Sequence, residues 1–254
     1  KGDIEAQLAA HRVGESRMMD LMATHSVETT WEHADALMDY SLRMTEAVIE
    51  KIPDGDYHFE DALEGDGQTE MDIPIRATIH VRGNQMEVDF EGSAPQVAGN
   101  VNAVKAIVRS ATWYCVRLLA EDDVPVNYGC FAPVTVIAPQ GSVLNPYFPA
   151  AVSVGNTETG QRVVDVVLGA LAQALPEIIP AASQGTMNNF TVGGFQNGQQ
   201  FVYYETIGGG HGASASGDGL SGRQSHMTNT MNTPTESLEM SYPIRVLQYG
   251  LREG

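Results

Sequence analysis

The spacing of apolar residues changes along this chain, and the change restricts the folds that the chain can adopt. Near the N-terminus, apolar side chains recur every three or four residues, as one buried helix face requires. Residues 71–90 instead alternate apolar and polar side chains, which is typical of strands with one buried face. Helical spacing returns at residues 102–119 and 158–175. Both periods in one chain predict an α+β fold.

Residues 1–53 are expected to form an N-terminal helical hairpin. The first helix carries an apolar stripe, which we expect to be buried: Ile4, Leu8, Met18, Leu21 and Met22. Thr29-Thr30-Trp31-Glu32 matches a capping box, in which a threonine oxygen and a glutamate carboxylate satisfy free amides at a helix start. Pro53-Asp54-Gly55 ends the second helix. We therefore divide the chain into a helical segment, 1–53, and an α+β core, 54–254.

The core is expected to contain a mixed β-sheet packed with helices. The turn Arg82-Gly83-Asn84 separates two alternating runs, so residues 71–90 are predicted to form a β-hairpin. The two later helices should cover this sheet and be largely buried. Further short strands are expected at residues 133–138, 151–154 and 201–207. From Ser183 onward glycine, asparagine, serine and threonine dominate, which indicates a loop-rich C-terminal part.

The charge of the chain argues against several classes of partner. Fourteen basic and 32 acidic residues give a net charge of −18, which repels nucleic-acid backbones and anionic lipid headgroups. At 43% hydrophobic residues the chain is too apolar for a disordered acidic tail. No apolar run approaches the roughly 20 residues that a membrane span needs, and no signal-peptide core is recognisable. We expect a folded cytoplasmic protein with reduced thiols at Cys115 and Cys130.

The run Gly208-Gly209-Gly210-His211-Gly212-Ala213 is a candidate for ligand binding. Backbone amides of successive glycines, here Gly209 and Gly210, can form an anion-binding nest. The residues that follow are a poor helix start, so the run is not a dinucleotide fingerprint. The alternative is a glycine-rich turn that needs positive φ angles.

The run from Ser225 to Pro234 combines one imidazole with two side-chain amides. His226 could act as a general base or a metal ligand. Asn229 lies three residues further on, so both side chains fall within one turn. Together with Asn232 they suit hydrogen bonding to a ligand. Equally, such side chains could satisfy the backbone of turns.

Residues 155–162 lie between an expected strand and an apolar helix. Amides at that helix start would favour an anionic group, and Asn156 and Glu158 lie beside them. Glu158 could instead serve only as the acidic residue of a helix N-terminus. No set of histidine, cysteine or acidic residues has the spacing of a metal site, so we expect no metal in this sequence.

Three stretches of the chain resemble the hydantoinase B family. They are AASQGTMNN at residues 181–189, YYETIGGGHGA at residues 203–213, and SHMTNT at residues 225–230 followed by Pro234 and Glu236. Further matches are Asn145-Pro146, Gly155-Asn156, Glu158, Gln161-Arg162 and Asp165. The resemblance covers essentially the whole chain. At His211 the family more usually has methionine or alanine, so we do not expect that histidine to be essential.

The resemblance implies a component of an ATP-dependent cyclic amide hydrolase of the hydantoinase or 5-oxoprolinase type. In this family ATP is held by a hydantoinase-A-like ATPase subunit, which is thought to phosphorylate the substrate oxygen. As catalytic residues we choose Glu205, His226 and Asn229. As substrate-binding residues we choose Asn156, Glu158, Gly209, Gly210 and Asn232.

Family members of this type are about twice as long as this chain. Their N-terminal part carries a histidine and aspartate segment expected to bind a divalent metal, and no G-H-H-A-D segment occurs here. We therefore expect this chain to correspond to a middle-to-late piece that assembles with the rest of its unit in a hetero-oligomer. Two alternatives stay open: a subunit of an ATP-dependent ketone carboxylase of the acetone or acetophenone type, and a non-catalytic assembly module.

Overall fold

The computed structural model describes residues 1–120, 123–228 and 230–251. Its elements are α1 (Gly2–His25), α2 (Val27–Ile49), β1 (Gly55–Leu63), β2 (Ile73–Arg82), β3 (Gln85–Asp89), α3 (Lys105–Leu118), η1 (Tyr128–Phe131), β4 (Val134–Ile137), η2 (Gly155–Thr159), α4 (Gly160–Leu171), β5 (Asn188–Gln196), β6 (Gln199–Ile207) and α5 (Thr235–Ser241). This composition confirms the α+β prediction. No helix in the described ranges is both long and apolar enough to cross a bilayer.

The main sheet has four strands in the order β1-β2-β3-β4. The pairs β1-β2 and β2-β3 are antiparallel, whereas β3-β4 is parallel, so the predicted mixed sheet is confirmed. The predicted hairpin is β2-β3, and Ile79 lies opposite Val88 in its register. Strict alternation along β2 buries the side chains from Ile73 to Val81 on one face and leaves the intervening residues half-buried. This face is the floor of the core.

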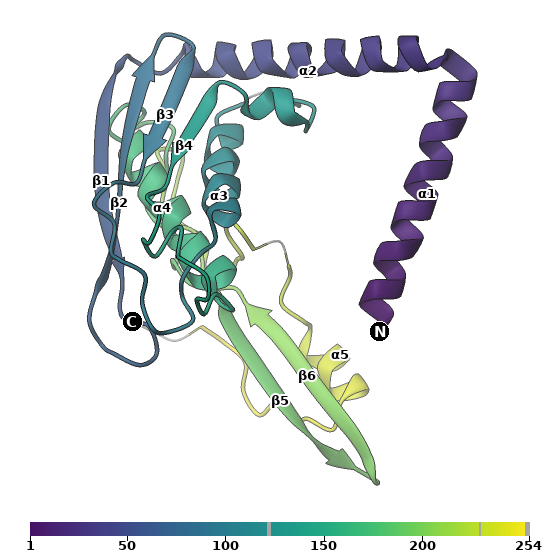
Figure 1. Cartoon of the computed structure of the whole chain (residues 1–254). Helices are drawn as coiled ribbons and strands as arrows, with labels where there is room; N and C mark the ends of the chain where they lie inside the picture. Colours follow the sequence, from purple (N-terminus) through teal and green to yellow (C-terminus); the bar gives the residue numbers. More distant parts are fainter. Residues whose placement is uncertain (121–122, 229, 252–254) are drawn as a thin grey trace.

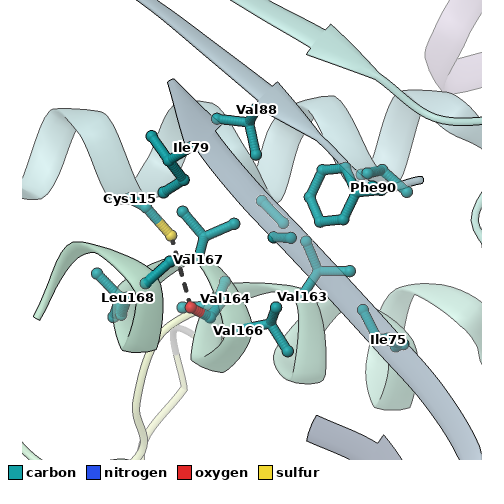
Figure 2. Close-up of a cluster of buried hydrophobic side chains, with 14 of the residues drawn as sticks. Ile75, Ile79, Val88, Phe90, Cys115, Val163, Val164, Val166, Val167 and Leu168 are labelled. Carbon is teal, nitrogen blue, oxygen red and sulfur yellow. Dashed lines mark hydrogen bonds between the residues drawn. The ribbon is translucent and has the colours of Figure 1, made fainter. Parts of the chain in front are cut away.

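Helix α4 covers the buried face of the sheet and α3 packs beside α4 (Figure 1). Ten of the twelve residues of α4 are buried, whereas α3 buries one face. Figure 2 shows strand residues such as Ile75 and Phe90 meeting Val163 and Val166 of α4, with Cys115 of α3 at the edge of the cluster. Burying one such aliphatic or aromatic side chain contributes about 1.5–3 kcal/mol. The core thus holds α4 rigidly, and α4 carries part of the candidate site.

The two N-terminal helices are present, but α1 is not buried as predicted. None of its residues, all of them described, is buried. Figure 1 shows α2 leading away from the sheet and α1 turning off it at Ser26. Only the C-terminal half of α2 enters the core, through Ser41, Thr45 and Ile49. The apolar spacing of α1 predicted a helix correctly, but spacing alone does not supply an element for that face to pack against.

The start of α2 differs from the predicted capping box. Its N-cap is Ser26, whose hydroxyl accepts a hydrogen bond from the Thr29 amide at 3.2 Å. Thr29 therefore lies inside the first turn rather than at the cap. Serine satisfies a free amide as well as threonine does, so the helix begins at the earlier of the two suitable residues.

The strand predictions outside the main sheet need two corrections. Residues 151–154 contain no strand, because they run directly into the helical turn η2. Conversely, β5 lies in a region expected to be loops, and pairs with β6 in a separate two-stranded sheet. Asn197 and Gly198 form its turn with φ angles of 52° and 79°. That dipeptide is the preferred centre of a tight hairpin turn, so the signal was in the sequence.

Candidate functional site

A cavity of about 520 Å³ lies between α3 and the C-terminal loops. Its apolar wall includes Tyr114, Leu118, Pro180, Ala181 and Leu220. Its polar wall includes Ser183, His211, Ser214, Asp218, Ser225 and His226. The volume falls in the usual range for small-molecule sites, about 300–1,000 Å³, and a mostly apolar wall with a few convergent polar groups is the usual lining.

The imidazole of His226 is held in place from two sides. Gln161 of α4 is buried and its amide nitrogen donates to the Ser225 carbonyl at 3.2 Å and to the Thr228 hydroxyl at 2.8 Å. The Gln161 oxygen accepts from the Met227 amide at 3.2 Å. One side chain of the core therefore fastens the loop before and after His226.

The backbone of His226 itself is unusual. Its φ is +53°, a left-handed conformation that costs energy for a residue with a side chain. The ring contacts Tyr114 edge-to-face, with centroids 6.2 Å apart. Residues in such conformations cluster at functional sites, where the surrounding structure maintains them.

Asp165 lies behind His226, on the side away from solvent. Its Oδ1 is 3.7 Å from His226 Nε2, and its side chain is only 3% exposed. Neither oxygen has a hydrogen-bond partner among the described residues. Burial raises the pKa of Asp165 to about 6; Arg162 opposes that rise and Asp61 adds to it. Burial, together with His211, lowers the pKa of His226.

Arg162 lies close to Asp165 but is bonded elsewhere. Its Nη1 donates to the carboxylate of Asp61 on β1. The same cluster is closed by Gly185, at φ +73°, where an added Cβ would lie 3.1 Å from Asp165 Oδ2 and 3.3 Å from Arg162 Nη2. Glycine is therefore needed there both for its conformation and for its size.

Glu158 and Asn156 belong to η2, a wide helical turn that leads into α4. Burial raises the pKa of Glu158, against a hydrogen bond from the Met187 amide and the charge of Arg162. Wide turns of this type are frequent at functional sites. Neither Glu158 nor Asn156 lines the 520 Å³ cavity.

Glu205 and Asn232 are engaged in holding loops. The Glu205 carboxylate accepts hydrogen bonds from the Tyr203 hydroxyl at 2.6 Å and from the Thr233 amide. Burial opposes its ionisation, but these hydrogen bonds outweigh burial and lower its pKa. Asn232 accepts from the Gly208 amide at 2.8 Å. Both lie outside the lining of the cavity, so the structure does not bring Glu205 together with His226 there. Asn229 lies outside the described residues.

Gly209 and Gly210 line a second hollow of about 410 Å³, which shares His211 and Leu220 with the first. A Cβ on Gly209 would lie 1.7 Å from Gln184 Oε1, an oxygen that has no hydrogen-bond partner within the described part of the chain. Gly210 has a φ of +143°, in keeping with the alternative of a glycine-rich turn. The glycines therefore serve close packing of loops and also border a hollow.

Asp165, Gln161 and Tyr114 were assigned no role from the sequence. A signal for the first two exists, because they lie four residues apart on an otherwise apolar helix and so share one face. No signal for Tyr114 stands out. No group of three or more histidine, cysteine or acidic residues in the described ranges could hold a metal ion.

Comparison with known proteins shows the family. The family model for hydantoinase B/oxoprolinase matches residues 1–254. 5-Oxoprolinase 1 of Arabidopsis thaliana is 38% identical over 265 residues, which is 99% of this chain and 20% of that protein. The putative B-type component of a D-/L-hydantoinase from Pseudomonas sp. strain NS671 is 32% identical over 99% of this chain and 44% of that protein.

Two solved structures are similar in fold. The ATP-dependent caprolactamase of Pseudomonas jessenii superposes with a TM-score of 0.84 at 27% identity, over 98% of this chain and 44% of that chain. An acetone carboxylase superposes with a TM-score of 0.73 at 18% identity, over 89% of this chain and 33% of that chain, which shows the fold alone. This chain spans less than half the length of these relatives. It belongs to the hydantoinase B/oxoprolinase family.

Proposed function

We propose that this chain is a component of an ATP-dependent enzyme that hydrolyses cyclic amides. Hydantoin, 5-oxoproline and caprolactam, which the names of its relatives contain, all hold an amide within a ring. The observation that carries the proposal is the cavity walled by His226, in a chain that matches this family over its whole length. An imidazole beside a small-molecule cavity suits proton transfer during amide cleavage.

The complex that we propose has at least two further parts. ATP would bind to a hydantoinase-A-like ATPase subunit, because the sequence has no phosphate-binding loop of the G-K-S/T type. The rest of the family unit, with a divalent metal, would complete the hetero-oligomer in the cytoplasm. We keep 1–53 as a helical segment and 54–254 as the core; the exposure of α1 supports a role for that segment in assembly.

Phosphorylation of the amide oxygen would make the ring open to water. Water adds to the carbon of the phosphorylated C=N bond. When the ring nitrogen then gains a proton, the C–N bond breaks with its electron pair on nitrogen, leaving an amine and an acyl phosphate. A second water releases phosphate from the acyl phosphate. Without that proton, phosphate leaves first and the starting amide returns, so ATP is hydrolysed without product.

His226 is the group that we propose for delivering this proton. Asn229 would hold the developing oxyanion, and Asn156, Glu158, Gly209, Gly210 and Asn232 would bind substrate. Glu205 was chosen as a third catalytic residue, but its hydrogen bonds to Tyr203 and Thr233 support a role in holding the loop. The catalytic proposal therefore depends mainly on His226.

The test uses the complete complex and measures phosphate release and ring-opened product together. With hydantoin, 5-oxoproline or caprolactam as substrate, the wild-type complex is expected to form product without bicarbonate. The variant His226→Ala should release more phosphate per product formed. ATP hydrolysis that requires both bicarbonate and a ketone would instead identify a carboxylase subunit. Unchanged product formation by His226→Ala would favour the non-catalytic assembly module.

A further inference from the structure

We infer that Asp165 is a positioning residue for His226: its carboxylate takes the Nε2–H of the imidazole and leaves Nδ1 to exchange a proton in the cavity. The identity of the molecule in the cavity rests on the proposed function, but the pairing of the two side chains does not. The inference adds a residue that neither the sequence motifs nor the predicted site included.

The first support is the lack of any other partner for Asp165. Buried carboxylates are nearly always hydrogen-bonded, because an unpaired one loses its hydration without replacement. Asp165 has no such bond within the described ranges, and Arg162 donates to Asp61 instead. The ion-pair contact that Asp165 does have is His226 Nε2 at 3.7 Å. A closure of about 1 Å would convert this contact into a charge-assisted hydrogen bond.

The second support is the way in which the ring is held. His226 keeps a left-handed backbone, with φ +53°, between two residues bonded to Gln161. Its ring packs against Tyr114 and borders the cavity. Neither ring nitrogen forms a hydrogen bond to another described residue, so nothing competes with Asp165 for Nε2. The imidazole thus lies between a buried carboxylate and the cavity.

The charged and titratable groups around the pair come from every packed element. They are Arg162 of α4, Asp61 of β1, Tyr114 and Cys115 of α3, and His211 of the C-terminal loop. Arg162 favours the carboxylate form of Asp165, whereas Asp61 and burial oppose it. Burial and His211 favour the neutral form of His226. The pair therefore titrates as one coupled unit near neutral pH.

The decisive experiment does not depend on enzymatic activity. Diethyl pyrocarbonate modifies neutral imidazoles, and peptide mass mapping of the intact complex follows His226 separately from the other histidines as pH is varied. Removing the carboxylate with Asp165→Asn should lower the pH midpoint of His226 modification by about one unit or more, because an opposite charge at this distance favours the imidazolium. An unchanged midpoint in a folded Asp165→Asn variant would overturn the inference.

A matched control is available on the sheet. Asp56 contacts His80 Nδ1 at 2.7 Å, so Asp56→Asn removes a carboxylate from a different histidine. The midpoint of His226 should stay unchanged in that variant. A shift of His226 in both variants would point to overall charge rather than to the pair, and would contradict the inference.

Kinetics then connect the pair to turnover. If the two residues act as a unit, Asp165→Asn should lower kcat at least about tenfold with little change in KM, and combining it with His226→Gln should cost no more than His226→Gln alone. Asp165→Glu should restore part of the rate. Additive losses would mean that Asp165 acts independently of His226. Failure of the complex to hydrolyse any cyclic amide would reject the proposed function and leave the modification result standing.

If Asp165→Asn does not fold, the wild-type protein still decides the matter. Nitrogen-15 shifts of labelled histidine distinguish the two neutral tautomers, and His226→Gln identifies the signal. We expect the Nε2–H tautomer, since that proton faces Asp165. The Nδ1–H tautomer would overturn the inference.

Discussion

The side-chain amide of Gln161 donates a hydrogen bond of 2.8 Å to the hydroxyl of Thr228, which is 67 residues further along the chain. Gln161 belongs to the buried helix α4, whereas Thr228 follows His226 in the C-terminal loop. The rigidity of the core is thereby transmitted to the loop that carries the candidate base. This attachment, and the buried Asp165 beside it, make the site open to direct tests.

Replacing Gln161 by alanine should loosen the His226 loop. The variant loses three hydrogen bonds and leaves their partners less satisfied, which costs about 1–3 kcal/mol of unfolding free energy. Turnover should fall with stability because His226 is no longer held. Urea unfolding and steady-state kinetics measure both. Gln173→Ala, an exposed change just beyond the end of α4, should leave both unchanged, and an equal effect there would contradict a specific role for Gln161.

Alanine at His226 or Asn229 should impair turnover more than folding. Removing a general acid or base typically lowers the rate by roughly 10²–10⁴-fold. Melting temperature should change little, because the His226 ring makes no hydrogen bond to another described residue. Normal turnover with a lowered melting temperature would assign these residues to the scaffold. His11→Ala, on the exposed helix α1, serves as the control.

The contribution of Asp165 to stability should depend on pH in an unusual direction. Folding raises its pKa from 3.8 to about 6, so the folded state binds this proton more tightly than the unfolded state. Stability from this group is therefore greatest below about pH 4 and is lost as pH rises through 6, by about 3 kcal/mol in total. Asp165→Asn lacks the effect. The difference in unfolding free energy between wild type and Asp165→Asn, measured by urea at several pH values, should change across this window; a constant difference would disprove it.

Gly185→Ala should disturb the Asp165 cluster beyond the strain of its backbone. An L-residue at φ +73° costs about 1–2 kcal/mol, and the new Cβ also presses on Asp165 Oδ2 from 3.1 Å. Gly198→Ala, at φ +79° with no atom within 4 Å of its Cβ, carries the strain alone. Both variants should lose stability, and Gly185→Ala should also lose turnover. Equal turnover in the two would show that the cluster tolerates crowding.

The secondary structure was largely predictable from local pattern. The alternation in residues 71–90 became β2 and β3, and the apolar helices became α3 and α4, because burial of one face imposes its period on the sequence. Where two local signals competed, the prediction was less accurate. Ser26 took the cap expected at Thr29, and the Asn197-Gly198 turn marked a hairpin that the polar composition had hidden.

The site was predictable only in part. The polar run containing His226 and the family resemblance both pointed to the C-terminal loops, and His226 does border a cavity there. The same pattern grouped Glu205 with His226, although Glu205 is bound to Tyr203 and Thr233. Composition identifies residues that are able to do chemistry. It does not identify which of them already form hydrogen bonds with neighbouring groups of the chain.

The sequence by itself determined the periods, and hence which helices and strands form and which faces they can bury. Only the tertiary structure decided that α1 remains exposed and that Asp165 of α4 lies behind His226. The reason is physical: periodicity depends on contacts between near neighbours in the chain. The surroundings of Asp165 instead depend on how β1, α3, α4 and a distant loop pack together, and packing also sets its desolvation and its pKa.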